Sequence, residues 1–175
     1  MPREIIELDP LTHITVDAIG KPGERVFFLQ ASSAERSITL LVEKVQIQTL
    51  NLAVRRFLEE IKASYPALTD ASDAYDEKDM HITPPVDPLF RVGEMTLAYD
   101  VDRDMMSLIV REILSGEMQP EDAAEVRLWG TRSQMLAMCA WGETLAARGR
   151  PICPQCGQPM EPEGHFCPKK NGHKH

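Results

Sequence analysis

The chain has 175 residues, of which 43% are hydrophobic and 26% are charged, and its formal net charge is −8. This composition is typical of a globular protein with its own core, and no apolar run approaches the roughly 20 residues of a membrane span. The acidic balance argues against a nucleic-acid surface over the whole protein, because such binding depends on neutralising phosphates. The first residues lack the basic and then apolar order of a secretory signal, so we expect a cytoplasmic protein.

The first half of the chain predicts three strands followed by a helix. Apolar, β-branched and aromatic residues indicate strands over 13–19, 25–31 and 37–43, separated by Gly-rich or polar turns. Further along, the apolar residues take a helical spacing, at Ile47, Leu50, Val54, Phe57, Leu58 and Ile61. The charged residues between them fall on the opposite side, so one face of this helix should lie on a core.

Residues 64–88 interrupt this regular order. They contain six Asp or Glu residues, one Lys and four prolines, with little apolar periodicity. Such a segment favours an exposed acidic linker or long loop. We assign it no function.

The second half repeats the order of the first. Strand-like runs cover 90–99 and 125–129, and we favour a strand for 105–114 although a helical period also fits it. Thr131-Arg-Ser-Gln134 is a capping box, which predicts a helix from there to Gly149. The expected fold class is therefore α+β, an antiparallel sheet system on which both helices pack. The repeated β-β-β-α order leaves an internal duplication open as an alternative, supported by only two shared residues near the helix starts.

Three cysteines near the C-terminus have the spacing of a zinc site. Cys153-Pro-Gln-Cys156-Gly forms one knuckle of a zinc ribbon, and Cys167 follows in a second Cys-Pro turn. Lys170 stands where a ribbon would place its fourth cysteine, so a histidine must complete the shell. We favour His165 over His173, because Gly164 before it allows the chain to fold back. Four protein ligands would make the zinc structural.

Two other interpretations of the cysteines remain open. The segment could be a metal-free turn that happens to contain three cysteines. A Cys-x-x-Cys pair can also cycle between a dithiol and a disulfide. Redox pairs usually open a helix after a strand, whereas this pair lies among prolines and glycines. Cys139 falls on the apolar face of the second predicted helix and is expected in the core.

We expect a body over residues 1–149 and a zinc-binding tail over residues 150–175. From Arg148 onwards the chain carries five Lys or Arg residues and two acids, a net charge of +3 beside an acidic body. Lys169 and Lys170 could therefore contact phosphate and bind nucleic acid weakly. The alternative is a tail that docks on its own body or is solvated.

Three motifs together resemble a known family. They are Gly20-x-Pro-Gly-x-Arg25-x-Phe-Phe-Leu-Gln30-Ala, Phe90-Arg-Val-Gly93-x-Met95, and the cysteine segment from Cys153 to Gly172. In this order they are similar to an uncharacterised bacterial family, seen mainly in actinobacteria and known only as domain of unknown function 3090. The resemblance implies a single α/β body, a strand over 105–114 and a Cys/His tail. It implies no activity and no catalytic residues.

The sequence leaves two classes of function. No phosphate loop, dinucleotide fingerprint, nucleophile elbow or paired-histidine helix motif is present in it. The first class is a non-enzymatic binding or regulatory protein with a protein partner and a structural zinc. The second is an enzyme whose site forms only in the fold. Its pocket would be built by Arg25, Gln30, Arg91 and Glu94, which flank strand ends.

Overall fold

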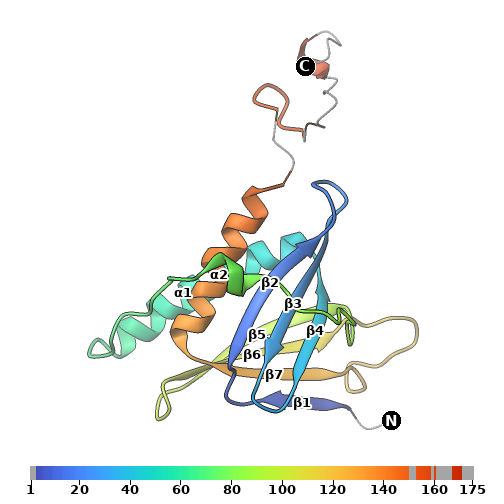
Figure 1. Ribbon diagram of the computed structural model, residues 1–175. Coiled ribbons are helices and arrows are strands. Elements are labelled where there is room, and N and C mark those ends of the chain that lie inside the picture. Colours follow the sequence, from blue (N-terminus) through green and yellow to red (C-terminus); the bar gives the residue numbers. More distant parts are fainter. Residues whose placement is uncertain (1–2, 150–152, 159, 161–166, 171–175) are drawn as a thin grey trace.

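Two β-sheets and two helices build the part of the chain that the computed structural model describes, residues 3–149, 153–158, 160 and 167–170 (Figure 1). One sheet has the strand order β1-β7-β6-β5 and the other has the order β2-β3-β4. The strands are β1 (Ile5–Leu8), β2 (His13–Ile19), β3 (Val26–Ser32), β4 (Ser37–Val42), β5 (Val92–Asp100), β6 (Met105–Glu112) and β7 (Glu125–Gly130). The α-helices are α1 (Lys44–Ser64) and α2 (Arg132–Ala147), and 3-10 turns lie at η1 (Glu77–Met80) and η2 (Pro168–Lys170).

The predicted α+β class is confirmed, with one addition. Each of the six predicted strands and both predicted helices exists, and residues 105–112 form a strand. The addition is β1, which pairs in parallel with β7 so that Leu8 lies opposite Leu128. All other neighbouring strands within the two sheets are antiparallel. A strand of only four residues, whose partner lies more than a hundred residues away, gives almost no local signal.

The core lies between the inner faces of the sheets and the helices. In β3 the residues that belong to the core cluster alternate along the strand, at Phe27, Leu29 and Ala31. The apolar faces of both helices join the same cluster. The sheets also meet at their ends, where the Leu41 amide donates to the Phe90 carbonyl and the Leu11 amide donates to the Trp129 carbonyl. None of the described helices is long and apolar enough to cross a membrane.

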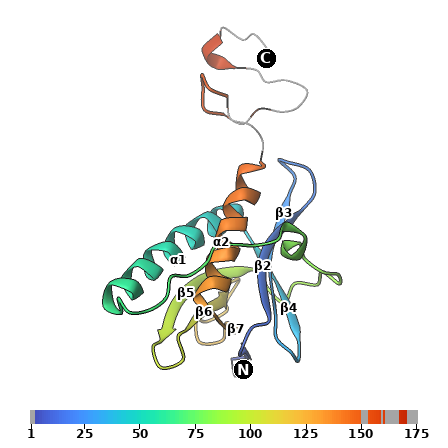
Figure 2. The ribbon, with the colours of Figure 1, turned by 60° about the vertical axis from the view of Figure 1, so that its left-hand side comes forward.

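The two helices are exchanged between the two halves of the chain. After β1, the element order is β-β-β-α in each half of the chain. Helix α1 follows the first three strands but contacts β5 of the second half. Helix α2 follows the second three and contacts mainly β2 of the first half, with a smaller contact to β6 of its own half. Figures 1 and 2 show the two helices crossing beside the sheets. Each half therefore contributes the helix that covers the other half.

Several positions of the two helices correspond when they are shifted by 88 residues. Gln46 and Gln134 play the same part, since each side-chain oxygen accepts from the backbone amide three residues earlier. Each Gln amide group also donates to a carbonyl at the start of the opposite half, at Val92 and Leu11. Four pairs of buried positions obey the same shift: Ile47 and Met135, Leu50 and Met138, Asn51 and Cys139, Val54 and Gly142.

The helices meet at equivalent points. Arg55 and Glu143, again 88 positions apart, form an ion pair with two hydrogen bonds of 2.8 and 3.0 Å. Close to it, the helix axes approach at Gly142, where an added Cβ atom would lie 3.2 Å from the side chain of Asn51. A local twofold relation between the halves would place equivalent positions opposite each other, as is seen here.

Residues 72–83, which we call the strap, belong to the connection between the halves and lie across α2 and the sheet β2-β3-β4. The strap begins at α2, where the Ser72 amide donates to the hydroxyl of Ser133. It ends at β2 and β3, where the Asp17 carboxylate accepts from the Ile82 amide at 2.9 Å. Gln30 binds the Thr83 backbone through both its oxygen and its nitrogen.

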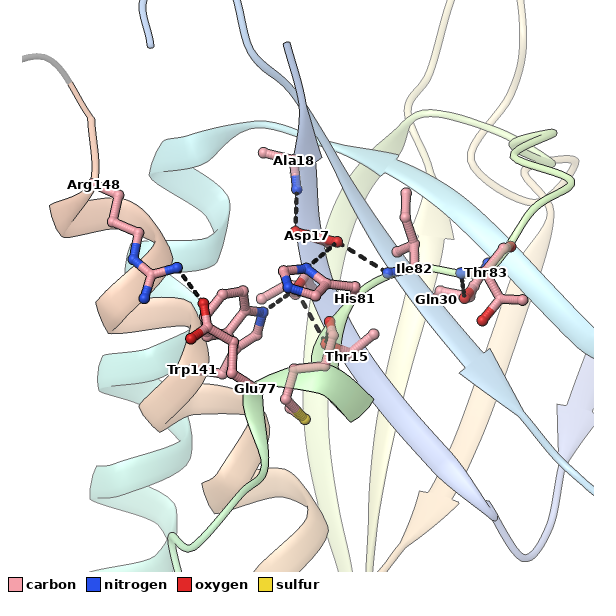
Figure 3. A network of polar contacts seen from close by, with 12 residues as sticks. Thr15, Asp17, Ala18, Gln30, Glu77, His81, Ile82, Thr83, Trp141 and Arg148 are labelled. Atoms are coloured by element: carbon pink, nitrogen blue, oxygen red, sulfur yellow. Dashed lines mark hydrogen bonds and ion pairs between the residues drawn. The ribbon is translucent and has the colours of Figure 1, made fainter. Parts of the chain in front are cut away.

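Figure 3 shows how the strap is held near its centre. The Met80 carbonyl accepts from the hydroxyl of Thr15 at 2.6 Å, and the His81 ring contacts the Asp17 carboxylate at 3.2 Å. Most strap residues are exposed, as the composition of 64–88 predicted, but Met80 is buried. The segment therefore does not act as a free linker, because polar side chains of sheet β2-β3-β4 bind its backbone.

Candidate metal centre and a groove beside helix α1

Three cysteines of the C-terminal segment converge. The described parts of this segment lie beyond the end of α2 (Figure 1). A tight turn presents two of them: the Gly157 amide donates to the Cys153 carbonyl, and the Cys153 amide donates to the Gln158 carbonyl. Gly157 has a φ of 73°, a conformation that residues with a Cβ atom rarely adopt. Cys167 directly precedes η2. All three sulfur atoms lie within 4.8 Å of one another.

The sulfur spacing fits a shared ion and not a disulfide. The sulfur atoms of Cys153 and Cys167 are 3.8 Å apart. A disulfide requires about 2.05 Å, whereas two sulfurs bound to one tetrahedral zinc at about 2.3 Å lie about 3.8 Å from each other. Both side chains are buried, with 1% and 0% of their surface exposed. Such burial in a short segment indicates that the turns close around the thiols, so the three cysteines could hold a metal ion.

Backbone amides make one of these thiols acidic. Hydrogen bonds from the Cys156 and Gln155 amides lower the pKa of Cys153 to about 7, although burial opposes this change. For Cys156, the Gln158 amide lowers the pKa, but burial and the neighbouring thiol of Cys153 raise it more, so its pKa is raised. One thiolate near neutral pH is the starting point for metal binding, because thiolates are the species that ligate.

The structure places only part of the predicted ligand set. Cys153, Cys156 and Cys167 come together as the spacing predicted. His165 and the alternative His173 both lie outside the described residues. Lys169 is exposed in η2. Cys139 is fully buried in α2, and burial raises the pKa of its thiol to about 12, as expected for a core cysteine.

A model of the family described as protein of unknown function DUF3090 matches residues 6–167. The chain belongs to this family. No curated protein and no solved structure matches it.

The four residues expected to line a catalytic pocket do not meet in this DUF3090 protein. Arg25 donates to the Leu145 carbonyl, and Gln30 is buried beneath the strap. Arg91 forms an ion pair with Glu43. Glu94 lies 3.9 Å from a guanidinium nitrogen of Arg111 and, alone of the four, lines the groove described next.

A groove between α1 and β5 is the site that sequence reasoning missed. It has a volume of about 1070 Å³ and a largely apolar wall formed by residues 45–60 of α1 and residues 93–97 of β5. Val45 and Leu52 on its helix wall are 63% and 72% exposed. These two residues lie outside the buried stripe of the predicted helix. Their position was the available signal, because large apolar side chains on the outer side of a helix are informative when they form a patch.

Proposed function

We propose that this DUF3090 protein is a non-enzymatic binding protein whose C-terminal segment is folded around a structural zinc ion. The observation that carries the proposal is the convergence of three cysteine sulfurs within 4.8 Å. Its body offers a protein-binding surface, and the groove beside α1 is the favoured candidate for it. All four cysteines lie in the described residues and none forms a disulfide, which suits a reducing compartment such as the cytoplasm.

The donor set favours zinc in a closed site. Thiolates with Cys-x-x-Cys spacing and one histidine form the Cys3His shells typical of structural zinc. His165 is the proposed fourth ligand, together with Cys153, Cys156 and Cys167. It lies within the family match, which ends at residue 167, whereas His173 does not. A shell of four protein ligands has no open position for water, which favours a structural role over a catalytic one.

The first prediction concerns zinc content. Protein purified without added metal should contain about one zinc per chain by elemental analysis, because thiolate ligation of structural zinc is very strong. Chelation should release the C-terminal segment and leave the body folded, since the body has its own core. Far-UV circular dichroism before and after chelation measures this. Zinc near zero with fully reactive Cys153 and Cys156 would contradict the proposal.

The second prediction separates the two histidines. His165→Ala should weaken zinc retention at least about tenfold, the scale seen even for the loss of an outer-shell partner. His173→Ala should leave retention nearly intact and serves as the matched control. Competition with a chromogenic chelator measures both variants under the same conditions. The reverse order would assign the ligand to His173.

A further inference from the structure

The groove beside α1 has a filled counterpart in the other half of the molecule. The shift of 88 positions that relates the helices takes Ala53, on the wall of the groove, to Trp141 of α2. Trp141 is fully buried, and its indole N–H donates to the Val16 carbonyl at the edge of β2 at 2.6 Å. An indole therefore fills between α2 and β2 the space that is open at Ala53 between α1 and β5.

The strap covers this filled counterpart. It contacts residues of α2 whose equivalents on α1 line the groove. Ser72 of the strap bonds Ser133, Tyr75 bonds Thr144, and Glu77 pairs with Arg148. Tyr75 packs edge-on against the Trp141 ring at 5.9 Å between ring centroids. His81 does the same from the other part of the strap at 5.5 Å (Figure 3). The residues of α1 that correspond to these four contact positions of α2 are Val45, Ala53, Arg56 and Glu60. All four line the groove.

The β-strand that borders the groove has a free edge. Strand β5 is the last in the order β1-β7-β6-β5, so none of the described strands pairs with its far side. The Ile113 amide donates to the Arg91 carbonyl beside β5, and the Glu112 amide donates to the Ala124 carbonyl beside β7. Backbone groups of successive residues in β6 therefore point in turn to β5 and to β7. With the observed register, the backbone groups of Met95 and Leu97 then point to the free edge.

Leu97 is the counterpart of Val16. Both lie five residues after the carbonyl that the helix glutamine binds, at Val92 and Leu11 respectively. In the first half the indole of Trp141 satisfies the edge carbonyl of Val16. In the second half the methyl side chain of Ala53 carries no hydrogen-bond donor. The edge carbonyl of Leu97 can therefore accept a hydrogen bond from a bound partner.

From this correspondence we propose that the groove between α1 and β5 binds an extended peptide segment of another protein. The segment lies along α1 as the strap lies along α2. A large aromatic side chain, best a Trp, enters beside Ala53 and donates its indole N–H to the Leu97 carbonyl. The inference rests on the binding function proposed above, names its site and partner class, and does not depend on zinc.

Charge specifies the peptide further. In the strap, Glu77 lies two residues after Tyr75 and pairs with Arg148. The counterpart of Arg148 is Glu60, which reverses the charge at this end of the groove. In the proposed complex the aromatic residue of the peptide takes the place of Tyr75 in the strap and reaches further, into the space that the Trp141 ring fills in the other half. An extended segment places positions i and i+2 on one side, so the residue two after it should be Lys or Arg. The preferred partner is an extended segment with the pattern aromatic-x-basic.

The test is a selection on the full-length protein with a displayed library of short random peptides that carry a fixed central Trp. We expect enrichment of Lys or Arg two positions after the Trp. Synthetic fluorescent copies of the enriched peptides then give dissociation constants by fluorescence polarisation. Replacing the Trp by Phe should weaken binding, because Phe fills the space but has no donor for the Leu97 carbonyl.

Two variants and one control localise the binding. Ala53→Trp supplies the indole from the helix, as Trp141 does, and should weaken the peptides at least about tenfold, the scale of one interface hot spot. Ala147→Trp makes the same change at an exposed position of α2 outside the groove and should leave binding unchanged. Glu60→Arg should reverse the selected charge from Lys to Glu. Because Ala53 is exposed, Ala53→Trp should fold normally, which thermal unfolding checks.

Three outcomes would overturn the inference. They are no enrichment, peptides that bind Ala53→Trp as well as wild type, or a dimer that Ala53→Trp dissolves, which would assign the groove to a second copy of the chain. Peptide binding should persist in Cys153→Ala, where the zinc site is destroyed. A missing zinc with intact peptide binding would reject only the metal centre, whereas zinc without peptide binding would reject only the groove.

Discussion

Replacing Trp141 with Ala should lower the free energy of unfolding by about 3–5 kcal/mol, the cost of truncating a large buried aromatic side chain. The ring is fully buried, and its removal also leaves the Val16 carbonyl without the indole donor. Its edge contacts with Tyr75 and His81 are lost at the same time. Urea unfolding of the variant and the wild type measures the difference.

The same substitution should release the strap. Because Trp141 is the surface against which Tyr75 and His81 pack, we expect new proteolytic cleavage within residues 72–83 of the variant under native conditions. Trp129→Ala is the matched control, since that ring is only partly buried and bonds Glu7. It should cost about 1–2 kcal/mol and leave the strap protected. An equal loss of unfolding free energy in the two Trp variants would contradict the conclusion that Trp141 is the surface that holds the strap.

Replacing Arg132 with Met should lower the free energy of unfolding by about 2–3 kcal/mol, the scale of hydrogen bonds to charged groups. The buried guanidinium binds both carboxylate oxygens of Asp104, at 2.7 and 3.0 Å, and the Thr69 carbonyl at 2.7 Å. It thereby joins the start of α2, the β5–β6 turn and the segment before the strap. Arg55→Met removes a similar two-bond pair with Glu143 from an exposed position and should cost less than about 1 kcal/mol.

The contribution of this pair should depend on pH in a defined direction. The hydrogen bond from Arg132 is the main reason that the pKa of Asp104 lies below its usual value of 3.8, with burial opposing and the Tyr99 hydroxyl assisting. A carboxyl with a lowered folded pKa stabilises the protein above its unfolded pKa and loses this effect as the pH falls through the folded pKa. The stability difference between wild type and Arg132→Met should therefore shrink below about pH 4. A constant difference from neutral to acidic pH would assign the effect to packing of the Arg132 side chain.

Short-range patterns in the sequence determined the elements and the cysteine cluster. Thr131 and Gln134 are three residues apart and cap a helix through contacts with their own backbone, so the start of α2 follows from local sequence. The turn at Gly157 likewise depends on neighbouring residues, and the Cys-x-x-Cys spacing already sets Cys153 and Cys156 beside each other. The approach of Cys167 to these two cysteines was predicted from the spacing of a zinc ribbon.

Tertiary structure alone decided which surfaces these elements meet. Strand β1 pairs with β7 across almost the whole chain, and each helix covers the strands of the opposite half. The spacing of apolar residues along α1 fixes its buried face but carries no information on the distance to β5. That distance leaves a groove at Ala53, whereas Trp141 and the strap fill the equivalent place. Such contacts depend on packing between distant segments, which no local pattern in either segment encodes.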